Sequence, residues 1–558
     1  MTQRRILAGA SASRALDAEA AAQWSFNQFA LVEAAGRRAA EVLLAGFPRL
    51  FDSGSSPFAA VLAGAGNNGA DAMVILRSLI LQGRIGADNA VLLATRAPDS
   101  AEQNPWSESC RSLVKMGVRL ITLPGGGDEV RTVLREAGLI IDGLCGTGLR
   151  GPLREAGLAA LLNAPGGRGF MVSVDVPSGL SDEWKPGMPL LRADATLAVE
   201  PAKICLYKPA ARPFCGRILP VEGVFPPALM EAYREAELVD WDYCRTLIPP
   251  APPDSYKYSR GLAEIRAGAP GSTGAARIAA RGAQAAGAGL VRLVVDPAVH
   301  PILAASASAI MVVPDSGAVD FGAADSADPR FKPDALLLGP GWGRGPGRRA
   351  PLEAALALEE GGIPLVLDAD AIYLARDRVF HGNALLTPHP GELAALAGMP
   401  KEELLADPGP RLLALAREKK AHILFKSHTM FIASPGGDLA VVDGMAPVLA
   451  AGGSGDLLAG FCAGIAARQR AAGAEERNAA AGGPAGAAAP RGGGLYACAL
   501  AGAALLTRSA LDPRMGNRFV DALELADIGA DLAGRAWLPG PSAGEGRRGR
   551  KGRGDWER

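Results

Sequence analysis

Short apolar runs alternate with amphipathic stretches along most of this chain. In the first half they predict strands at 57–64, 90–94, 139–144 and 170–176, and helical spacing of apolar residues predicts helical structure over 11–45 and 70–81. Strands that are apolar on both faces are typical of a parallel sheet covered by helices on both sides. The pattern therefore predicts an α/β fold.

The same alternation returns in the second half. Apolar runs predict strands at 290–296, 335–338, 364–368, 384–386 and 422–425, a hairpin at 429–433 and 439–442, and a helix over 452–469. Between the halves lies the proline-rich segment 249–254, whose backbone favours the extended conformation of a linker.

These breaks predict the domain organisation. We expect a first domain over 1–245, a linker over 246–254, a second domain over 255–540 and a disordered basic tail over 541–558. Within the second domain, residues 470–494 are rich in Ala, Gly, Pro and Arg, which predicts a flexible insertion.

Composition narrows the class of protein. The chain has 558 residues, more than one domain usually holds, and 49% of them are hydrophobic, enough for large cores. The 58 basic and 58 acidic residues cancel, which argues against a protein that coats nucleic acid or binds an anionic membrane. The 71 glycines would fit a low-complexity chain, but many of them cluster in turns that follow predicted strands.

Cysteine spacing and hydropathy indicate the cellular compartment in which the protein is expected. The seven cysteines are widely spaced and form no CxxC pair, which argues against a disulfide framework or a structural zinc site and favours a reducing compartment. No apolar stretch reaches the roughly 18 residues of a membrane span. The short apolar run at the start ends at Ser11 and favours an ordinary helix over a signal peptide. We therefore expect a cytoplasmic protein.

Three loops in the first half carry candidate chemistry, because each follows a predicted strand. The loop 64–71 (GAGNNGAD) precedes a helix, where glycines let backbone N–H groups approach a phosphate. Two other loops begin at Asp142 and Asp175. Side-chain oxygens of Asn68, Asp142 and Ser178 suit a monovalent or divalent cation, and Asp175 suits acid–base catalysis. Turn formation and helix capping explain any one loop, but three in one parallel sheet favour a site.

The motifs LVEAAG (31–36), GNNGAD (66–71), DGLCGTG (142–148), DVPSG (175–179) and AVEPAK (198–203) together resemble NAD(P)H-hydrate epimerase. The resemblance implies an enzyme that interconverts the two C6 epimers of hydrated NAD(P)H, with Asp175 as the catalytic carboxylate. It implies K⁺ held by Asn68, Asp142 and Ser178. It implies substrate contacts from Asn67, Asn68, Gly69, Ala70, Asp71, Gly146, Thr147, Gly148, Leu149, Arg150, Gly151 and Pro152.

One departure stands out in the first loop. The family usually has GGDG where this chain has GADA, at 69–72. If Ala70 needed a positive φ, it would cost about 1 kcal/mol relative to glycine. Its added methyl group would also crowd the substrate.

The second half carries a glycine-rich turn, AGGSGDLLAG (451–460), at a predicted helix start. Backbone N–H groups there make an anion site, and Asp456 within the turn suits deprotonation of a hydroxyl that attacks a phosphoryl group. The segments GPGWG (339–343), DADA (368–371) and LTPHPGE (386–392) also follow predicted strands, and Lys426 ends another. No Walker A sequence occurs, which argues against a P-loop kinase.

These second-half motifs resemble the ribokinase-like superfamily and, within it, the ADP/ATP-dependent NAD(P)H-hydrate dehydratase, because TPHPGE is typical of that branch. The resemblance implies phosphorylation of the C6 hydroxyl, with Asp456 as the catalytic base, and elimination of phosphate to give NAD(P)H and AMP. It implies ADP as co-substrate, with ATP as the alternative, and Mg²⁺. It implies hydrate contacts from Ala275, Gly341 and His389 and nucleotide contacts from Lys426, Ser427, His428, Thr429, Met430 and Gly455. Ser427 and Ala269 depart from the usual Gly and Ser.

The two resemblances together imply two αβα domains, a Rossmann-like epimerase and a ribokinase-like dehydratase, with small-molecule substrates and a homo-oligomeric assembly. A ribokinase-like kinase of a small alcohol with a non-catalytic N-terminal binding domain is one alternative, and a scaffold that has lost epimerisation is another. The basic tail 541–558 favours a solvated terminus over nucleic-acid binding. The preference between NADH and NADPH hydrate stays open.

Overall fold

The computed structural model describes residues 4–52, 57–123, 127–164, 169–315, 332–480, 494–516, 518 and 520–536. The chain divides into two compact units, each described by itself. The first comprises Met1–Asp240, Arg376–Gly382 and Leu386–Ala446, and the second comprises Trp241–Ala375, Asn383–Leu385 and Pro447–Arg558. The predicted domain limits stay a prediction, and the tail 541–558 lies outside the described residues.

The first unit contains a seven-stranded parallel sheet in the order β4-β3-β2-β5-β6-β7-β9. Its strands are β2 (Ala59–Ala63), β3 (Ala90–Ala94), β4 (Arg119–Thr122), β5 (Leu139–Gly143), β6 (Phe170–Val174), β7 (Ala195–Val199) and β9 (Arg217–Val221). The four strands predicted from the first half are β2, β3, β5 and β6. The predicted parallel α/β arrangement is therefore confirmed.

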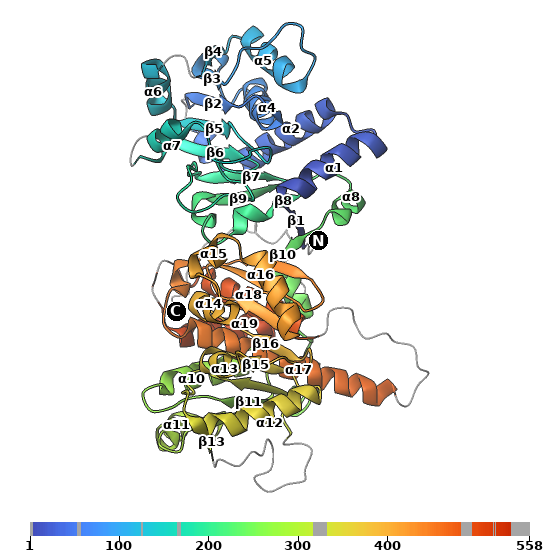
Figure 1. The fold of residues 1–558 in the computed structure, drawn as a ribbon, viewed down its shortest axis with the longest axis vertical. Coiled ribbons are helices and arrows are strands. Elements are labelled where there is room, and N and C mark those ends of the chain that lie inside the picture. Colours follow the sequence, from blue (N-terminus) through green and yellow to red (C-terminus); the bar gives the residue numbers. More distant parts are fainter. Residues whose placement is uncertain are drawn as a thin grey trace, which may run out of the picture. The chain divides into compact units, whose positions relative to one another are not determined.

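Helices cover both faces of this sheet (Figure 1). Helices α2 (Gln28–Gly46), α4 (Asn67–Leu81) and α5 (Pro105–Lys115) bury one face, and α6 (Gly127–Glu136) and α7 (Ala156–Asn163) bury the other. Successive strand residues point to opposite faces, so Val61 packs in the first core and Leu62 in the second. Continuously apolar strands thus follow from burial on both sides.

The predicted helical stretch 11–45 is two helices. Helix α1 (Ala10–Gln23) ends before Ser25, whose φ is 57°, and α2 begins after Asn27. The Asn27 side chain caps α2 by accepting a hydrogen bond from the N–H of Ala30 at 2.8 Å. The predicted helical structure is therefore present, and it is interrupted before Asn27 because Asn favours such capping bonds.

A second row of strands in the first unit runs β17-β18-β19-β10-β1-β8. Its members are β1 (Arg5–Ala8), β8 (Ala202–Lys203), β10 (Ala236–Leu238), β17 (His422–Phe425), β18 (Thr429–Ala433) and β19 (Leu439–Asp443). The predicted hairpin is the antiparallel pair β18–β19. Strand β1 was not predicted. It pairs in parallel with β8, which aligns Leu7 with Ala202 and Ala8 with Lys203.

Short helices complete the first unit. They are α3 (Arg49–Asp52), α8 (Pro227–Ala232), α14 (Pro390–Ala397), α15 (Lys401–Ala406) and α16 (Pro408–Lys419). Arg212 and Asp443 join distant parts of the sequence in this unit, because the Arg212 Nη2 lies 2.9 Å from the Asp443 carboxylate. Residues from 386 to 446 thus fold against the same unit as the N-terminal 240 residues.

The second unit holds strands in the order β13-β12-β11-β14-β15-β16, and the pairs from β13 to β15 are parallel. They are β11 (Leu262–Arg266), β12 (Leu290–Val295), β13 (Met311–Pro314), β14 (Ala335–Leu338), β15 (Leu365–Leu367) and β16 (Ala384–Leu386). Its helices are α9 (Trp241–Cys244), α10 (Thr273–Ala285), α11 (His300–Ser306), α12 (Arg349–Glu360), α13 (Ala369–Leu374), α17 (Ser454–Ala480), α18 (Leu495–Ala510) and α19 (Ala522–Gly534).

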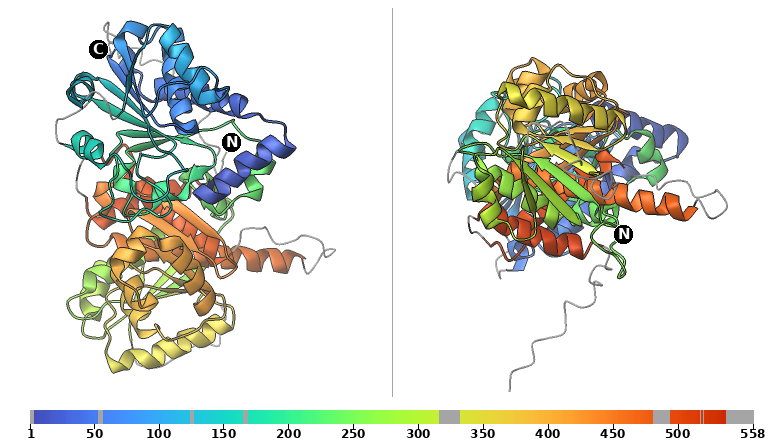
Figure 2. Two further views of the ribbon diagram at one scale, coloured as in Figure 1. Left: turned by 45° about the horizontal axis from the view of Figure 1, so that its top comes forward. Right: turned by 90° about the horizontal axis from the view of Figure 1, so that it is seen from below.

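Glycines bring α17 into backbone contact with α10. A Cβ at Gly460 would lie 2.2 Å from the carbonyl oxygen of Ala279, and one at Gly464 would lie 2.3 Å from that of Ala283. Helix α17, orange in Figure 2, continues to Ala480, so the predicted insertion starts later than residue 470. Residues 481–493 lie outside the described residues. No helix among the described residues has the length and apolar character needed to span a membrane.

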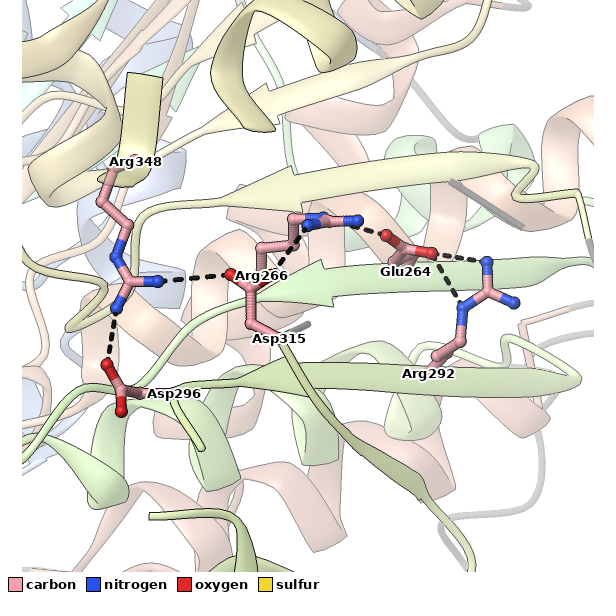
Figure 3. A network of polar contacts seen from close by, with 6 residues as sticks. All are labelled: Glu264, Arg266, Arg292, Asp296, Asp315 and Arg348. Atoms are coloured by element: carbon pink, nitrogen blue, oxygen red, sulfur yellow. Dashed lines mark hydrogen bonds and ion pairs between the residues drawn. The ribbon is translucent and has the colours of Figure 1, made fainter. Parts of the chain in front are cut away.

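Six charged side chains form a chain of ion pairs in the second unit (Figure 3): Arg292, Glu264, Arg266, Asp315, Arg348 and Asp296. Glu264 is 1% exposed and accepts hydrogen bonds from Arg266 Nε at 3.1 Å and Arg292 Nε at 2.8 Å. A buried charge is tolerated when it is paired in this way. Arg348 connects this series of ion pairs to the loop that follows β14.

Glu264→Ala tests this network. The substitution leaves the buried Arg266 and the nearly buried Arg292 without their carboxylate, so we expect the free energy of unfolding to fall by about 3–5 kcal/mol in urea unfolding followed by circular dichroism. The control is Glu41→Ala, which removes the exposed Arg38–Glu41 pair and should cost about 0.5 kcal/mol or less. Equal losses in the two variants would contradict the proposed role of Glu264.

Candidate functional site

A cavity of about 910 Å³ opens in the first unit at the carboxyl ends of β2, β5 and β6. Parallel strands present their ligand-binding loops at this edge. The sequence-predicted residues that line it are Asn67, Asn68, Asp71, Gly146, Thr147, Gly148, Leu149, Arg150, Pro152 and Asp175. The structure therefore brings together three loops that are far apart in the sequence.

Three predicted substrate residues do not line the cavity: Gly69, Ala70 and Gly151. A Cβ at Gly69 would lie 2.1 Å from the carbonyl oxygen of Gly64, so Gly69 lets α4 start directly against the end of β2. Ala70 is fully buried inside α4 and its φ is not positive. The expected strain at Ala70 is therefore absent, since a helical backbone accepts alanine readily.

Asp175 lies just after β6 and is ion-paired. Its Oδ1 is 2.7 Å from the Nζ of Lys203 in β8, and these side chains are 10% and 6% exposed. Lys203 Nζ also donates a hydrogen bond to the Val199 carbonyl at 3.0 Å. Asp175 has a φ of 65°, an unusual conformation for a non-glycine residue and one often found at functional sites. The sequence motif included Lys203 but gave it no role.

Two further carboxyl groups share this cavity, Asp71 on α4 and Asp17 on α1. Burial, followed by the charges of Asp175 and Asp17, raises the pKa of Asp71 well above its ordinary value. The Oδ1 of Asp71 is buried and has no hydrogen-bond partner among the described residues. Burial of Asp71 therefore favours its protonated form.

Asp17 was missed by the sequence reasoning. Its side chain is exposed to water in the cavity, but the protein surrounds it closely enough for desolvation to raise its pKa to about 6. The positive charge of Lys203 lowers this pKa and the negative charge of Asp175 raises it, so both groups lie within electrostatic reach. The available signal was an acidic residue within the predicted helical stretch 11–45.

Asp142 ends β5 and is fully buried. Its carboxylate accepts hydrogen bonds from Ser173 Oγ at 2.7 Å, from Ser178 Oγ at 2.5 Å, and from the N–H groups of Ser178 at 2.9 Å and Leu144 at 3.2 Å. Burial raises the pKa of Asp142, although the bonds from Ser178 and Ser173 favour the charged form. All of these donors are neutral.

Asn68 and Ser178 both form hydrogen bonds with the backbone of Cys145, and Ser178 also binds Asp142. The Asn68 Nδ2 donates to the Cys145 carbonyl at 3.0 Å, and the Cys145 N–H donates to Ser178 Oγ at 2.8 Å. The three predicted cation ligands therefore lie in one hydrogen-bonded cluster. Among the described residues no group of three or more His, Cys, Asp and Glu side chains is placed to bind a metal. The cluster instead offers one carboxylate with neutral amide, hydroxyl and carbonyl oxygens.

In the second unit, the predicted anion turn and the GPGWG loop lie against the same helix, α10. Asp456 is in the first turn of α17, and a Cβ on neighbouring Gly453 would lie 2.5 Å from Ile278 of α10. Gly341 has a φ of 53°, and a Cβ there would lie 3.2 Å from the Cβ of Ala275. The structure thus brings Gly341 and Ala275 together at the start of α10.

The predicted ligand residue His389 lies in the first unit, where it caps α14. Its Nδ1 accepts hydrogen bonds from the N–H groups of Gly391 at 2.9 Å and Glu392 at 3.3 Å, and Glu392 accepts one from the His389 N–H at 2.8 Å. The side chain is 56% exposed. His389 therefore has a structural role, and its Nε2 lies 3.3 Å from the Glu392 carboxylate.

The predicted nucleotide segment 426–430 also lies in the first unit. The Ser427 hydroxyl closes a turn with the backbone of Thr429, and the His428 Nε2 lies 2.9 Å from the Pro209 carbonyl. Thr429 and Met430 are buried in β18.

Two family models match successive parts of the sequence. Residues 28–205 match the family model described as YjeF-related protein N-terminus, and residues 263–501 match the model described as NAD(P)H-hydrate dehydratase. A solved structure, ADP/ATP-dependent NAD(P)H-hydrate dehydratase from Bacillus subtilis co-crystallised with ATP/Mg²⁺, has 23% identity and a TM-score of 0.44, and the match covers 53% of this chain and 98% of that chain.

Curated relatives span both halves. A bifunctional NAD(P)H-hydrate repair enzyme from Salinibacter ruber is 31% identical over 82% of this chain and 87% of its own length. An enzyme of the same name from Gloeobacter violaceus is 34% identical over 79% of this chain and 84% of its own length. The chain therefore belongs to the family of bifunctional NAD(P)H-hydrate repair enzymes.

Proposed function

We propose that this protein repairs hydrated NAD(P)H in two steps, epimerisation at C6 followed by nucleotide-dependent dehydration of the S form. The observation that carries the first step is the Asp175–Lys203 ion pair in a cavity of about 910 Å³, large enough to enclose a cofactor-sized ligand. The free thiols of all seven cysteines support a reducing compartment, and we place the enzyme in the cytoplasm.

Epimerisation requires that the hydroxyl group on C6 leave one face of the ring and return on the other. C6 is bonded to the ring nitrogen, whose lone pair can expel the hydroxyl group as water once it is protonated. Asp175, with Lys203 balancing its charge, is the base that takes a proton from the incoming water. The loops 67–71 and 146–152 hold the rest of the hydrate.

The cluster of Asn68, Asp142 and Ser178 fits a monovalent cation. Asp142 is a fully buried carboxylate whose hydrogen-bond donors are all neutral, so its charge favours a cation held with oxygens of Asn68, Ser178 and the Cys145 carbonyl. When bound, K⁺ would balance this charge and fix the loop that begins at Cys145, which lines the cavity.

Dehydration is assigned to the ribokinase-like part of the chain. Asp456, in the first turn of α17, accepts the proton of the C6 hydroxyl as the hydroxyl attacks the terminal phosphoryl group of ADP, and elimination of phosphate restores the ring. The N–H groups at the start of α17, including that of Gly455, stabilise the phosphoryl oxygens. Bound Mg²⁺ would supply further charge compensation for the phosphates.

Separate loss of the two activities tests this assignment. We expect Asp175→Asn to lower the rate of R-hydrate epimerisation about 10²–10⁴-fold and to leave dehydration of S-hydrate with ADP unchanged, because each carboxylate serves one proton transfer. Asp456→Asn should show the reverse. The first rate is followed by chromatography of the epimers, and the second by the return of nicotinamide absorbance. If Asp456→Asn released a stable phosphorylated product or kept full dehydration, the assignment would be wrong.

Potassium binding is tested by stability. We expect KCl to raise the thermal unfolding midpoint relative to choline chloride at equal ionic strength, because a ligand that binds only the folded state stabilises it. Asp142→Asn and Asn68→Ala should each abolish the difference. A KCl effect that persists in both variants, while circular dichroism shows native folding, would place the cation elsewhere.

A further inference from the structure

Epimerisation needs two proton-transfer groups, one on each face of the ring. One group must protonate the departing hydroxyl, and the other must deprotonate the water that arrives from the opposite side. The Asp175–Lys203 pair supplies one of them, and this reasoning rests on the proposed epimerase function. The second group must reach the same cavity and carry a proton when Asp175 does not.

The ionisable side chains that line the cavity are Arg14, Asp17, Asp71, Cys145, Arg150, Arg154, Glu155, Asp175, Glu200 and Lys203. Glu200 is committed elsewhere, because its Oε1 accepts hydrogen bonds from the N–H groups of Gly223 at 2.8 Å and Phe225 at 2.9 Å. Lys203 is held by Asp175 and the Val199 carbonyl. Arg14 donates to the Thr147 carbonyl at 2.6 Å.

Asp17 and Asp71 remain as carboxyl groups within electrostatic reach of Asp175. Burial raises the pKa of Asp71 well above its ordinary value, which disfavours release of its proton. The pKa of Asp17, raised by burial to about 6, lies close to neutrality, where a group both donates and recovers a proton efficiently. The Asp17 side chain is also exposed to solvent in the cavity, whereas the Oδ1 of Asp71 is buried.

The fold fixes Asp17 beside the ion pair. Strand β1 aligns Ala8 with Lys203 of β8, and α1, which carries Asp17, begins two residues after Ala8. The start of α1 is anchored by hydrogen bonds from the Gly9 N–H to Glu235 and from the Ala10 N–H to Asp182, both at 2.6 Å. The position of Asp17 relative to Lys203 is therefore set by strand pairing.

We propose that Asp17 is a second catalytic residue of epimerisation, the general acid that faces Asp175 across the substrate ring. Asp17 gives its proton to the C6 hydroxyl, the C6–O bond breaks, and water leaves while the nitrogen lone pair forms a C=N bond. A second water adds to C6 from the other face, the C=N pair returns to nitrogen, and Asp175 takes the released proton. Both carboxyl groups then exchange protons with water and return to their starting states.

The test compares Asp17→Asn, Asp17→Glu and the control Glu19→Gln in the full-length chain. Glu19 lies on the same helix but does not line the cavity. For the wild type, we expect epimerisation of R-hydrate, above the spontaneous rate, to fall about tenfold per pH unit above pH 6, because the acid must be protonated.

Asp17→Asn should lower this rate about 10²–10⁴-fold and remove that pH dependence. Asp17→Glu should keep the pH dependence, and Glu19→Gln should match the wild type. Dehydration of S-hydrate with ADP should be unchanged in every variant, which shows that the chain is folded. If Asp17→Asn keeps the wild-type rate and pH profile, or if it merely lowers the rate with the profile unchanged, Asp17 is not the acid.

A separate measurement tests the underlying function. Wild-type epimerisation in ¹⁸O-labelled water should place one labelled oxygen at C6 of the product, because the departing and arriving waters differ. An unlabelled product, or a wild-type rate equal to the spontaneous one, overturns the proposed epimerisation itself. Labelled product with an unaffected Asp17→Asn variant overturns only the role of Asp17.

Discussion

The ion pair between Lys203 and Asp175, in the cavity of the first unit, is the interaction on which the rest of the site depends. Lys203 lies 2.7 Å from Asp175 and balances its charge. Asp71 and Asp17 then lie near an ion pair that is already neutral, in surroundings that disfavour further charge. Their pKa values rise for that reason, far for the enclosed Asp71 and to about 6 for Asp17, which is open to the cavity. Burial is the largest cause of both shifts, the negative charge of Asp175 adds to it, and the positive charge of Lys203 opposes it.

Backbone contacts fix where these groups stand. The pairing of β1 with β8 places α1 beside Lys203, and Gly69 lets α4 begin against the end of β2. A Cβ at Gly143 would lie 2.6 Å from the Asn68 carbonyl, so the loop after β5 also approaches α4 without a side chain between them. Glycines at these points serve close packing of the site, which explains why many of them sit at strand ends.

The sequence predicted the strands and the loops that carry the chemistry, because both depend on local patterns. Runs of apolar residues marked β2, β3, β5 and β6, and residues that follow β2, β5 and β6 line the cavity. Strand β1 escaped prediction because four residues next to a helix carry no periodic signal, and its partners β8 and β10 are distant in the sequence. Asp17 was not predicted as a site residue because its place beside Lys203 depends on the pairing of β1 with the distant strand β8.

Ala70 and His389 show a second limit of prediction from sequence, because their roles depend on the local backbone conformation. The backbone conformation needed at Ala70 could not be read from a family pattern, and the helical φ there removes the expected strain. His389 was predicted to contact a ligand, and the structure shows it capping α14 through Nδ1. The cap uses Nδ1, and Nε2 lies 3.3 Å from the Glu392 carboxylate, so both ring nitrogens already have partners within the protein.

The two proposed sites handle charge by different means, which accounts for a chain with no net charge. The epimerase cavity moves protons between carboxyl side chains whose affinities are set by burial and by Lys203. The start of α17 offers backbone N–H groups and a single carboxylate, Asp456, to a phosphoryl group. Neither arrangement needs an excess of basic side chains on the surface, since the cavity balances Asp175 with one buried ammonium group and the start of α17 uses aligned peptide dipoles.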